Sequence, residues 1–308
     1  MNIIGTIVPI FAVIALGWGA RQKGMLPPEF LGTANRLVFY LAIPAMVFSA
    51  IAKASLQAHF NGAVAVIILA VMVATCALAW LAASLSRMAR RQRGAFIEDS
   101  FHGNQGYIGL AVAFYFLGPD GLARASILTG FMMILNNVLG VVVLQVHADA
   151  GEAKRGNTYA AGRIAGNPVI LSALAGILFA LSGARLPAII DRSLAIVSGM
   201  ALPLALLIIG GSLSVGLLKS RFYPVLAACL LKLVVMPAVG LGLFLLWGVS
   251  TQDFLPGLIL LATPTATVAY VLARQMKGDA DFAVVAISLS TLLSALTYTG
   301  WLAVASRL

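Results

Sequence analysis

Ten stretches of this chain are each apolar enough to cross a lipid bilayer. A membrane-spanning helix needs about 20 largely apolar residues. The predicted spans are residues 3–20, 32–52, 62–85, 98–117, 125–146, 166–183, 191–217, 222–247, 254–275 and 282–305. They take up nearly all of the 308 residues, of which 61% are hydrophobic and 10% charged. The sequence therefore predicts an all-α membrane protein with ten transmembrane helices, embedded in the lipid bilayer and without a soluble catalytic domain.

The second five spans repeat the first five at an offset of 159 residues. The pairs that this offset relates include Pro9 and Pro168, Gly17 and Gly176, Pro44 and Pro203, and Asp120 and Asp279. An odd number of spans in each repeat turns the second copy upside down relative to the first. We predict two inverted five-helix repeats, residues 1–147 and 166–308, joined by a cytoplasmic loop at 148–165.

The same offset places Asn104-Gln105-Gly106, in the fourth span, on Thr263-Pro264-Thr265, in the ninth. Each glycine costs a helix about 1 kcal/mol relative to alanine, and proline removes a backbone donor. Non-helical backbone persists at membrane depth only where it lines a cavity or is buried in protein. We expect broken helices 4 and 9 to cross near the midplane, although close packing of small residues is an alternative. Matched interruptions in inverted repeats are typical of secondary transporters.

The net charge of +10 is explained by membrane topology rather than by nucleic-acid binding. If the N-terminus lies outside, fourteen of the 20 lysines and arginines fall in inward loops and five face outward. Cytoplasmic loops are enriched in these residues. We therefore predict that both termini face out, in a multi-pass protein of the cell membrane, a bacterial inner membrane in view of the short loops.

Four polar residues within the spans are candidates for function. Lys232 is predicted near mid-bilayer, and all acidic residues are predicted at span ends or in loops, so it would suit an anionic substrate. Alternatively it bonds helix carbonyls or extends toward the surface. Asn136 and Asn137, in the fifth span, would contact substrate or join helices, and His102 would carry a proton or serve structure.

No zinc-ligand spacing, phosphate loop or nucleophile–base arrangement is present, so neither an enzyme nor a cofactor or metal site is expected. Cys76 and Cys229 each lie inside a predicted span. Lone cysteines there are expected to pack as small apolar side chains.

Several motifs, taken in order, resemble those of the auxin efflux carrier family. They are Leu41-Ala42-Ile43-Pro44, Gly103-Asn104-Gln105-Gly106-Tyr107-Ile108-Gly109, Gly166-Asn167-Pro168, Leu231-Lys232-Leu233 with Pro237, and Thr263-Pro264-Thr265. The family includes plant auxin exporters and bacterial permeases assigned to malonate and other organic acids.

The resemblance implies a scaffold of spans 1, 2, 6 and 7 and a transport domain of spans 3–5 and 8–10, with a homodimer formed through the scaffold. It places the substrate site at Asn104, Gln105, Gly106, Pro264 and Thr265. Plant members carry proline at the crossing in both repeats, whereas this chain has Gln105 at the matching position of the first.

We therefore expect a secondary active transporter for a small organic anion, a carboxylate, working by elevator-type alternating access. Lys232 and the half-helix ends would bind the charge, and Asn104 and Thr265 would orient the substrate. Two alternatives stay open. One is a sodium-coupled organic-anion symporter resembling the bile-acid family, and the other is a membrane sensor that binds a ligand without moving it.

Overall fold

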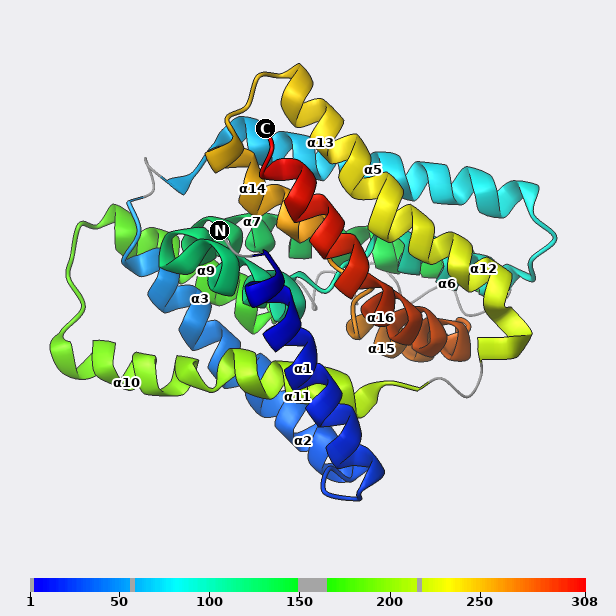
Figure 1. Cartoon of the computed structure of the whole chain (residues 1–308), viewed down its shortest axis with the longest axis horizontal. Helices are drawn as coiled ribbons and strands as arrows, with labels where there is room; N and C mark the ends of the chain where they lie inside the picture. The colour runs from blue at the N-terminus through cyan, green and yellow to red at the C-terminus, as the bar shows by residue number, and fades with distance from the viewer. Residues whose placement is uncertain (1–2, 56–58, 149–164, 215–217) are drawn as a thin grey trace.

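A computed structural model describes residues 3–55, 59–148, 165–214 and 218–308, in which every regular element is a helix (Figure 1). The elements of the first half are α1 (Ile3–Gln22), α2 (Pro28–Leu37), η1 (Val38–Ala42), α3 (Ile43–Ala52), α5 (Gly62–Leu85), α6 (Arg90–Phe101), η2 (Gln105–Gly109) and α7 (Leu110–Val146). Those of the second half are α9 (Pro168–Leu181), α10 (Ala188–Gly199), α11 (Ala201–Ser212), α12 (Leu218–Leu230), η4 (Leu231–Val235), α13 (Met236–Leu246), α14 (Thr251–Leu261), α15 (Val268–Gln275) and α16 (Ala280–Ala305). The all-helical prediction is confirmed.

Seven helices or helix runs in the described residues are long and apolar enough to cross a membrane. The longest, Gln105–Val146, contains Gly118 at φ 72°, ψ −163°, a backbone conformation that ends one helix and begins another. A further apolar helix, Pro168–Leu181, is shorter. The chain is thus a multi-pass membrane protein, while the count of ten spans and the inverted relation of the repeats stay predictions. The predicted loop 148–165 lies almost wholly outside the described residues.

Two prolines explain two wider, π-type turns in the helix runs. η1 ends two residues before Pro44, and η4 ends two residues before Pro237. A proline inside a helix has no N–H to donate and its ring presses on the carbonyl four residues earlier. The preceding turn widens to relieve that contact. One of these turns, η4, carries Lys232.

Glycines allow the closest contacts between helices of the predicted scaffold. A side chain at Gly210 of α11 would collide with the backbone of Ile14 in α1, and one at Gly17 would collide with Leu207. Gly176 of α9 is placed less tightly, because a side chain there would meet the Ile51 side chain of α3 at 3.0 Å and the Phe48 carbonyl at 3.3 Å. Close backbone approach through small residues is a usual way in which membrane helices pack. The offset partners Gly17 and Gly176 thus both lie at close helix contacts, the first against backbone and the second mainly against a side chain.

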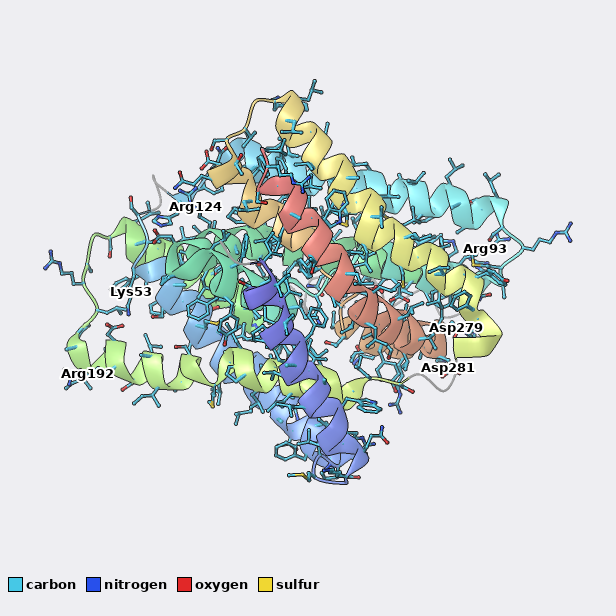
Figure 2. The ribbon with its side chains drawn as sticks, viewed as in Figure 1. Lys53, Arg93, Arg124, Arg192, Asp279 and Asp281 are labelled. Atoms are coloured by element: carbon cyan, nitrogen blue, oxygen red, sulfur yellow. The ribbon has the colours of Figure 1, made fainter. Side chains whose placement is uncertain are left out.

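Charged side chains lie mainly at the ends of the helices. Figure 2 shows Lys53, Arg93 and Arg124 at the periphery of the molecule, and Asp279 and Asp281 together at the start of α16. Large apolar side chains are exposed along several helices, such as Leu178 and Ile196. An apolar surface of this kind is what lipid requires of the helices that face it.

Candidate functional site

Two non-helical segments pair with each other in the middle of the molecule. α6 ends at Phe101, and helical backbone resumes at Gln105; α14 ends at Leu261, and α15 begins at Val268. The Asn104 N–H donates to the Pro264 carbonyl at 2.7 Å, and the Ala266 N–H donates to the His102 carbonyl at 2.9 Å. Gly103 and Thr265 thereby form an antiparallel bridge. These bonds satisfy backbone groups that the interrupted helices leave unpaired.

Gly103 is required at this crossing. A side chain there would collide with the Thr263 hydroxyl and would meet Lys232 Cε at 2.9 Å. Any other residue would therefore force the two segments apart. Pro264, opposite, contributes a carbonyl acceptor and has no N–H that needs a partner.

The hydroxyls of the second segment bond to backbone. Thr265 Oγ1 donates to the Asp99 carbonyl at 2.9 Å, and Thr263 Oγ1 donates to the Leu260 carbonyl at 2.8 Å. The Thr265 N–H donates to Ser290 Oγ at 3.1 Å. Thr265 therefore ties α14–α15 to the end of α6 and to α16. Its hydroxyl is already used in this contact and does not point to an orienting role for substrate.

Lys232 is fully buried, and its ammonium donates to the Leu261 carbonyl at 2.7 Å. Leu261 is the last residue of α14, so the cation lies at the negative end of that helix and bonds a carbonyl that the helix leaves free. This is the carbonyl-bonding alternative of the sequence interpretation. The geometry assigns Lys232 a structural contact behind the crossing rather than a direct contact with a ligand in the cavity described next.

A cavity of about 900 Å³ adjoins the crossing. Its walls come from both predicted bodies, the scaffold and the transport domain. Scaffold residues in the wall include Asn35, Arg36, Phe39, Tyr40, Asn167, Ile208 and Ser212; residues of the transport domain include His102, Gly103, Asn104, Gln105, Gly106, Tyr107, Met133, Asn137, Thr267, Tyr270 and Gln275. Four predicted site residues, Asn104, Gln105, Gly106 and Asn137, thus come together here. The other four, Asn136, Lys232, Pro264 and Thr265, do not line it.

Two cavity-lining residues at the crossing carry buried amide N–H donors. Asn104 Nδ2 and Gln105 Nε2 have no hydrogen-bond partner among the described residues, and both side chains are buried. Gln105 Oε1 accepts from Asn136 Nδ2 at 3.1 Å, so Asn136 orients Gln105 from behind. Asn137 Nδ2 donates to the Met133 carbonyl at 2.7 Å. Buried donors without partners in the protein are suited to a ligand that carries acceptors.

Three residues that line the cavity, Asn35, Arg36 and Tyr107, were not predicted as site residues from the sequence. Arg36 is an exposed cation in the cavity wall, and the sequence analysis counted it only as a loop charge. The Tyr107 hydroxyl donates to Asn35 Oδ1 at 2.7 Å, which joins η2 to α2 across the cavity. A hint existed for Arg36, because a basic residue within an apolar span needs a reason to be there.

Two acidic residues correct the prediction that all acids lie at span ends or in loops. Glu98 and Asp99 are essentially unexposed, and His102 Nδ1 lies 2.7 Å from Glu98 Oε1. The predicted span begins at residue 98, whereas α6 begins at Arg90. The two acids therefore lie in the last turns of a helix that runs directly into the crossing.

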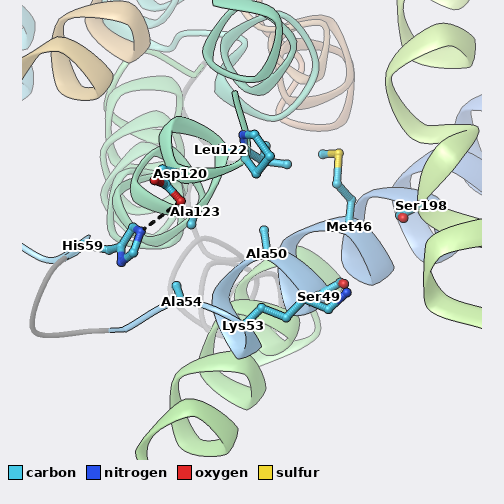
Figure 3. Close-up of a pocket in the computed structure, with 11 residues that line it drawn as sticks. Met46, Ser49, Ala50, Lys53, Ala54, His59, Asp120, Leu122, Ala123 and Ser198 are labelled. Atoms are coloured by element: carbon cyan, nitrogen blue, oxygen red, sulfur yellow. Dashed lines mark ion pairs between the residues drawn. The ribbon is translucent and has the colours of Figure 1, made fainter. Parts of the chain in front are cut away.

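A second, smaller hollow of about 250 Å³ lies at the opposite ends of the same helices (Figure 3). Ile43, the first residue of α3, lines the large cavity, and Lys53, directly after its last residue, lines the small hollow. On α7, Met133 lines the large cavity and Ala123 the small hollow. At 1.5 Å per residue, each pair is separated by about 15 Å along its helix. At the small hollow, which both residues line, His59 contacts Asp120 at 3.5 Å.

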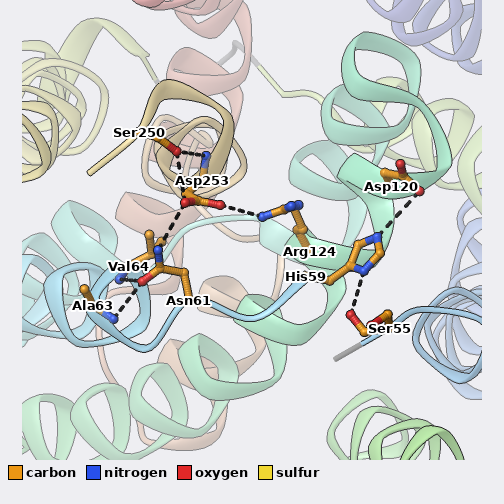
Figure 4. Close-up of polar contacts among 9 residues, drawn as sticks. All are labelled: Ser55, His59, Asn61, Ala63, Val64, Asp120, Arg124, Ser250 and Asp253. Carbon is orange, nitrogen blue, oxygen red and sulfur yellow. Dashed lines mark hydrogen bonds and ion pairs between the residues drawn. The ribbon is translucent and has the colours of Figure 1, made fainter. Parts of the chain in front are cut away.

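Next to this hollow, side chains at three helix ends form a network (Figure 4). Arg124 donates to Asp253 Oδ1 at 2.8 Å, Asn61 donates to Asp253 Oδ2 at 3.3 Å, and Ser250 donates to the same oxygen at 2.9 Å. Desolvation raises the pKa of Asp253, but these hydrogen bonds and the charge of Arg124 outweigh it and hold the pKa below its usual value. Polar groups at this end are paired, in contrast to the unpartnered amides at the crossing.

Comparisons with known proteins identify the family of the chain. The family described as membrane transport protein matches residues 2–302. The chain is 27% identical, over 98% of its length and 95% of the relative's, to a Rhizobium meliloti (strain 1021) protein named "Putative malonate transporter". It is 25% identical, over 96% of both chains, to an "Uncharacterized transporter" of Methanothermobacter thermautotrophicus. The chain belongs to the membrane transport protein family of auxin efflux carriers.

Proposed function

We propose that the protein is a secondary active carrier for a small organic anion, a carboxylate, which binds at the helix crossing. The observation that carries this proposal is the pair of unpartnered amide donors, Asn104 Nδ2 and Gln105 Nε2, at the wall of a cavity between the two predicted bodies. A carboxylate has only acceptor oxygens and would take both N–H groups.

The local field favours an anion as well. Two helices begin at the cavity, one at Gln105 and one at Val268, and both of these residues line it. The first N–H groups of a helix lack intrahelical partners and carry partial positive charge. Arg36 adds a full charge at the wall. The name of the Rhizobium relative gives malonate as the first anion to test.

For the transport cycle we propose an elevator movement. α5–α7 and α12–α16 would move as the transport domain past a scaffold of α1–α3 and α9–α11, with a homodimer formed through the scaffold. The large cavity lies at the boundary between these bodies and is bordered by Gly166, Ser212 and Gln275, close to loops that the positive-inside pattern assigns to the cytoplasm. In the proposed topology of the cell membrane, with both termini outside, the conformation is inward-facing. The network at Asp253 would lie on the outer side.

The alternative of a sodium-coupled symporter gains one observation, the buried acids Glu98 and Asp99. The predicted placement of all acidic residues at span ends or in loops leaves no acidic ligand for sodium inside the membrane, and these two buried acids remove that objection. A sensor that binds the anion without moving it is separated from both carriers by flux alone.

The test is counterflow of labelled malonate, malate, lactate and an indole acid in proteoliposomes. We expect one of these anions to exchange. Asn104→Ala and Gln105→Ala should each raise its KM roughly ten- to a hundredfold, because one lost hydrogen bond to a charged group is worth about 1.5–3 kcal/mol. Gln252→Ala, an exposed amide on α14, serves as the matched control. Binding of an anion without any counterflow would support the sensor instead, and unchanged KM values would remove the amides from the site.

A further inference from the structure

Ionisable side chains form a continuous path from the cavity into the protein behind the crossing. His102 lines the cavity but is only 4% exposed, and its Nδ1 lies 2.7 Å from Glu98 Oε1, one turn earlier on α6. The next residue, Asp99, is fully buried, and its carboxyl lies within interaction range of the Glu98 carboxyl. His–acid chains of this kind inside a membrane protein are typical of proton pathways.

The Asp99 carboxyl has an unusual environment. Neither of its oxygens accepts a hydrogen bond from an N–H or O–H donor within the described part of the chain. Its surroundings are a separate apolar cluster that includes Phe96, Phe101, Cys229 and Phe282. An ionised carboxylate buried without donors is strongly disfavoured, and two neighbouring carboxyls avoid double ionisation by sharing a proton.

Charged or titratable groups near the pair on other elements leave it without a counter-ion. Cys76 of α5 and Cys229 of α12 are near the two acids, and Asp279 at the start of α16 is itself paired with Arg221.

The cations on the other neighbouring elements have partners elsewhere. On the side of η4, the Lys232 ammonium bonds the Leu261 carbonyl. On α7, the uncharged Gly140 lies against Glu98. On α15, Arg274 bonds the Tyr270 hydroxyl. Among the described residues, no lysine or arginine forms an ion pair with Glu98 or Asp99.

The pair is also joined to the crossing itself. The Asp99 carbonyl accepts the Thr265 hydroxyl at 2.9 Å, and the His102 carbonyl accepts the Ala266 N–H at 2.9 Å. The three residues of the path therefore belong to the same short segment that holds the two broken helices together. A change of charge on the pair would act directly on the segment that bears Asn104 and Gln105.

We propose that the Glu98–Asp99 pair binds a proton that the carrier moves together with its anion, and that His102 passes this proton between the pair and the cavity. This inference rests on the proposed carrier function. In the loading step, His102 accepts a proton from cavity water at Nε2 and releases the Nδ1 proton to the Glu98 carboxylate. Unloading reverses both transfers, so the imidazole ends neutral.

A proton fits this place better than sodium. Hard metal cations take several oxygen ligands around them, but the Thr265 hydroxyl and the Asp99 carbonyl are bonded to each other, and the Ser100 hydroxyl donates to the Phe96 carbonyl. The remaining neighbours of the pair are mostly apolar. The site therefore supplies carboxyl oxygens for one proton but no oxygen cage for a metal ion.

The first experiment measures malonate accumulation in proteoliposomes with the membrane potential clamped at zero and a gradient of one pH unit. One-proton coupling supports about tenfold accumulation, because each 1.4 kcal/mol is a factor of ten. Asp99→Asn should lower the ratio to about one, and Asp281→Asn, an exposed acid on α16, should keep it near ten. A trapped pH dye should report proton entry in step with malonate.

Malonate counterflow without any response to the pH gradient would overturn the coupling proposal while leaving the carrier function intact. Accumulation that follows a sodium gradient instead would overturn it in favour of sodium. Persistence of tenfold accumulation in Asp99→Asn would remove the pair from the pathway.

A second experiment does not depend on any substrate. Infrared spectra of the purified protein at neutral pH should contain the carbonyl stretch of a protonated carboxylic acid. This band should disappear in Asp99→Asn and in Glu98→Gln and persist in Asp281→Asn. Absence of the band from the wild-type protein, or its persistence in both variants of the pair, would overturn the proton site even if malonate is not a substrate.

Discussion

The two broken segments occupy corresponding positions in the predicted repeat, yet their polar side chains differ in hydrogen bonding. The first, at Asn104 and Gln105, lines the cavity and carries buried amide N–H groups without a partner among the described residues. The second, at Thr263 and Thr265, bonds its hydroxyls to backbone carbonyls. The sequence offset thus predicts where the helices break, while the unpartnered amide donors lie in the first segment and the backbone-bonded hydroxyls in the second.

A substitution at Gly103 should have the largest effect, because it separates the two segments. Gly103→Ala places a methyl group against the Thr263 hydroxyl and Lys232 Cε, and overpacking of this kind typically destabilises by about 1–3 kcal/mol. We expect a lower Tm in detergent and loss of flux for every anion. Gly242→Ala, at a helical glycine with open space around it, is the control. Wild-type flux in Gly103→Ala would show that the segments need not touch.

Replacing Lys232 distinguishes a structural role of this cation from a role in ligand binding. Lys232→Met keeps most of the apolar stem but leaves the Leu261 carbonyl unsatisfied, at a cost of about 1–3 kcal/mol. We expect a lower Tm and reduced flux, with the KM for the transported anion unchanged. Lys23→Met, an exposed loop lysine, should change neither. An increase in KM with an unchanged Tm would return Lys232 to the substrate site.

The smallest effect is expected for the hydroxyl of the second segment. Thr265→Val removes the donor to the Asp99 carbonyl at nearly constant volume, and a typical hydrogen bond contributes about 0.5–1.5 kcal/mol. Thermal unfolding should register this loss, whereas anion KM should stay within twofold. Thr299→Val, which removes a local bond within α16, is the comparison. A larger change in KM than Asn104→Ala produces would reverse the roles assigned to the two segments.

Several elements of the site could be predicted from the sequence because they depend on local backbone chemistry. Proline and clustered glycines interrupt helices wherever they occur, so the positions near Gly103 and Pro264 were accessible without a structure. The cavity residues Asn104, Gln105 and Gly106 followed from the same reasoning, whereas Asn137 was predicted from its polar side chain inside the fifth span. Arg36 and Tyr107 were missed as site residues, because only the packing of α2 beside η2 brings them to the cavity.

The sequence by itself determined that the chain is a membrane protein built of helices, since long apolar stretches have one way to satisfy their backbone in lipid. It also determined where those helices are weak. Only the tertiary structure decided what each buried polar group contacts: Lys232 bonds a helix end, Thr265 bonds the Asp99 carbonyl, and Asp99 lies beside Glu98 without a donor. Partners from distant segments set these contacts, and the spacing of residues along one helix carries no record of them.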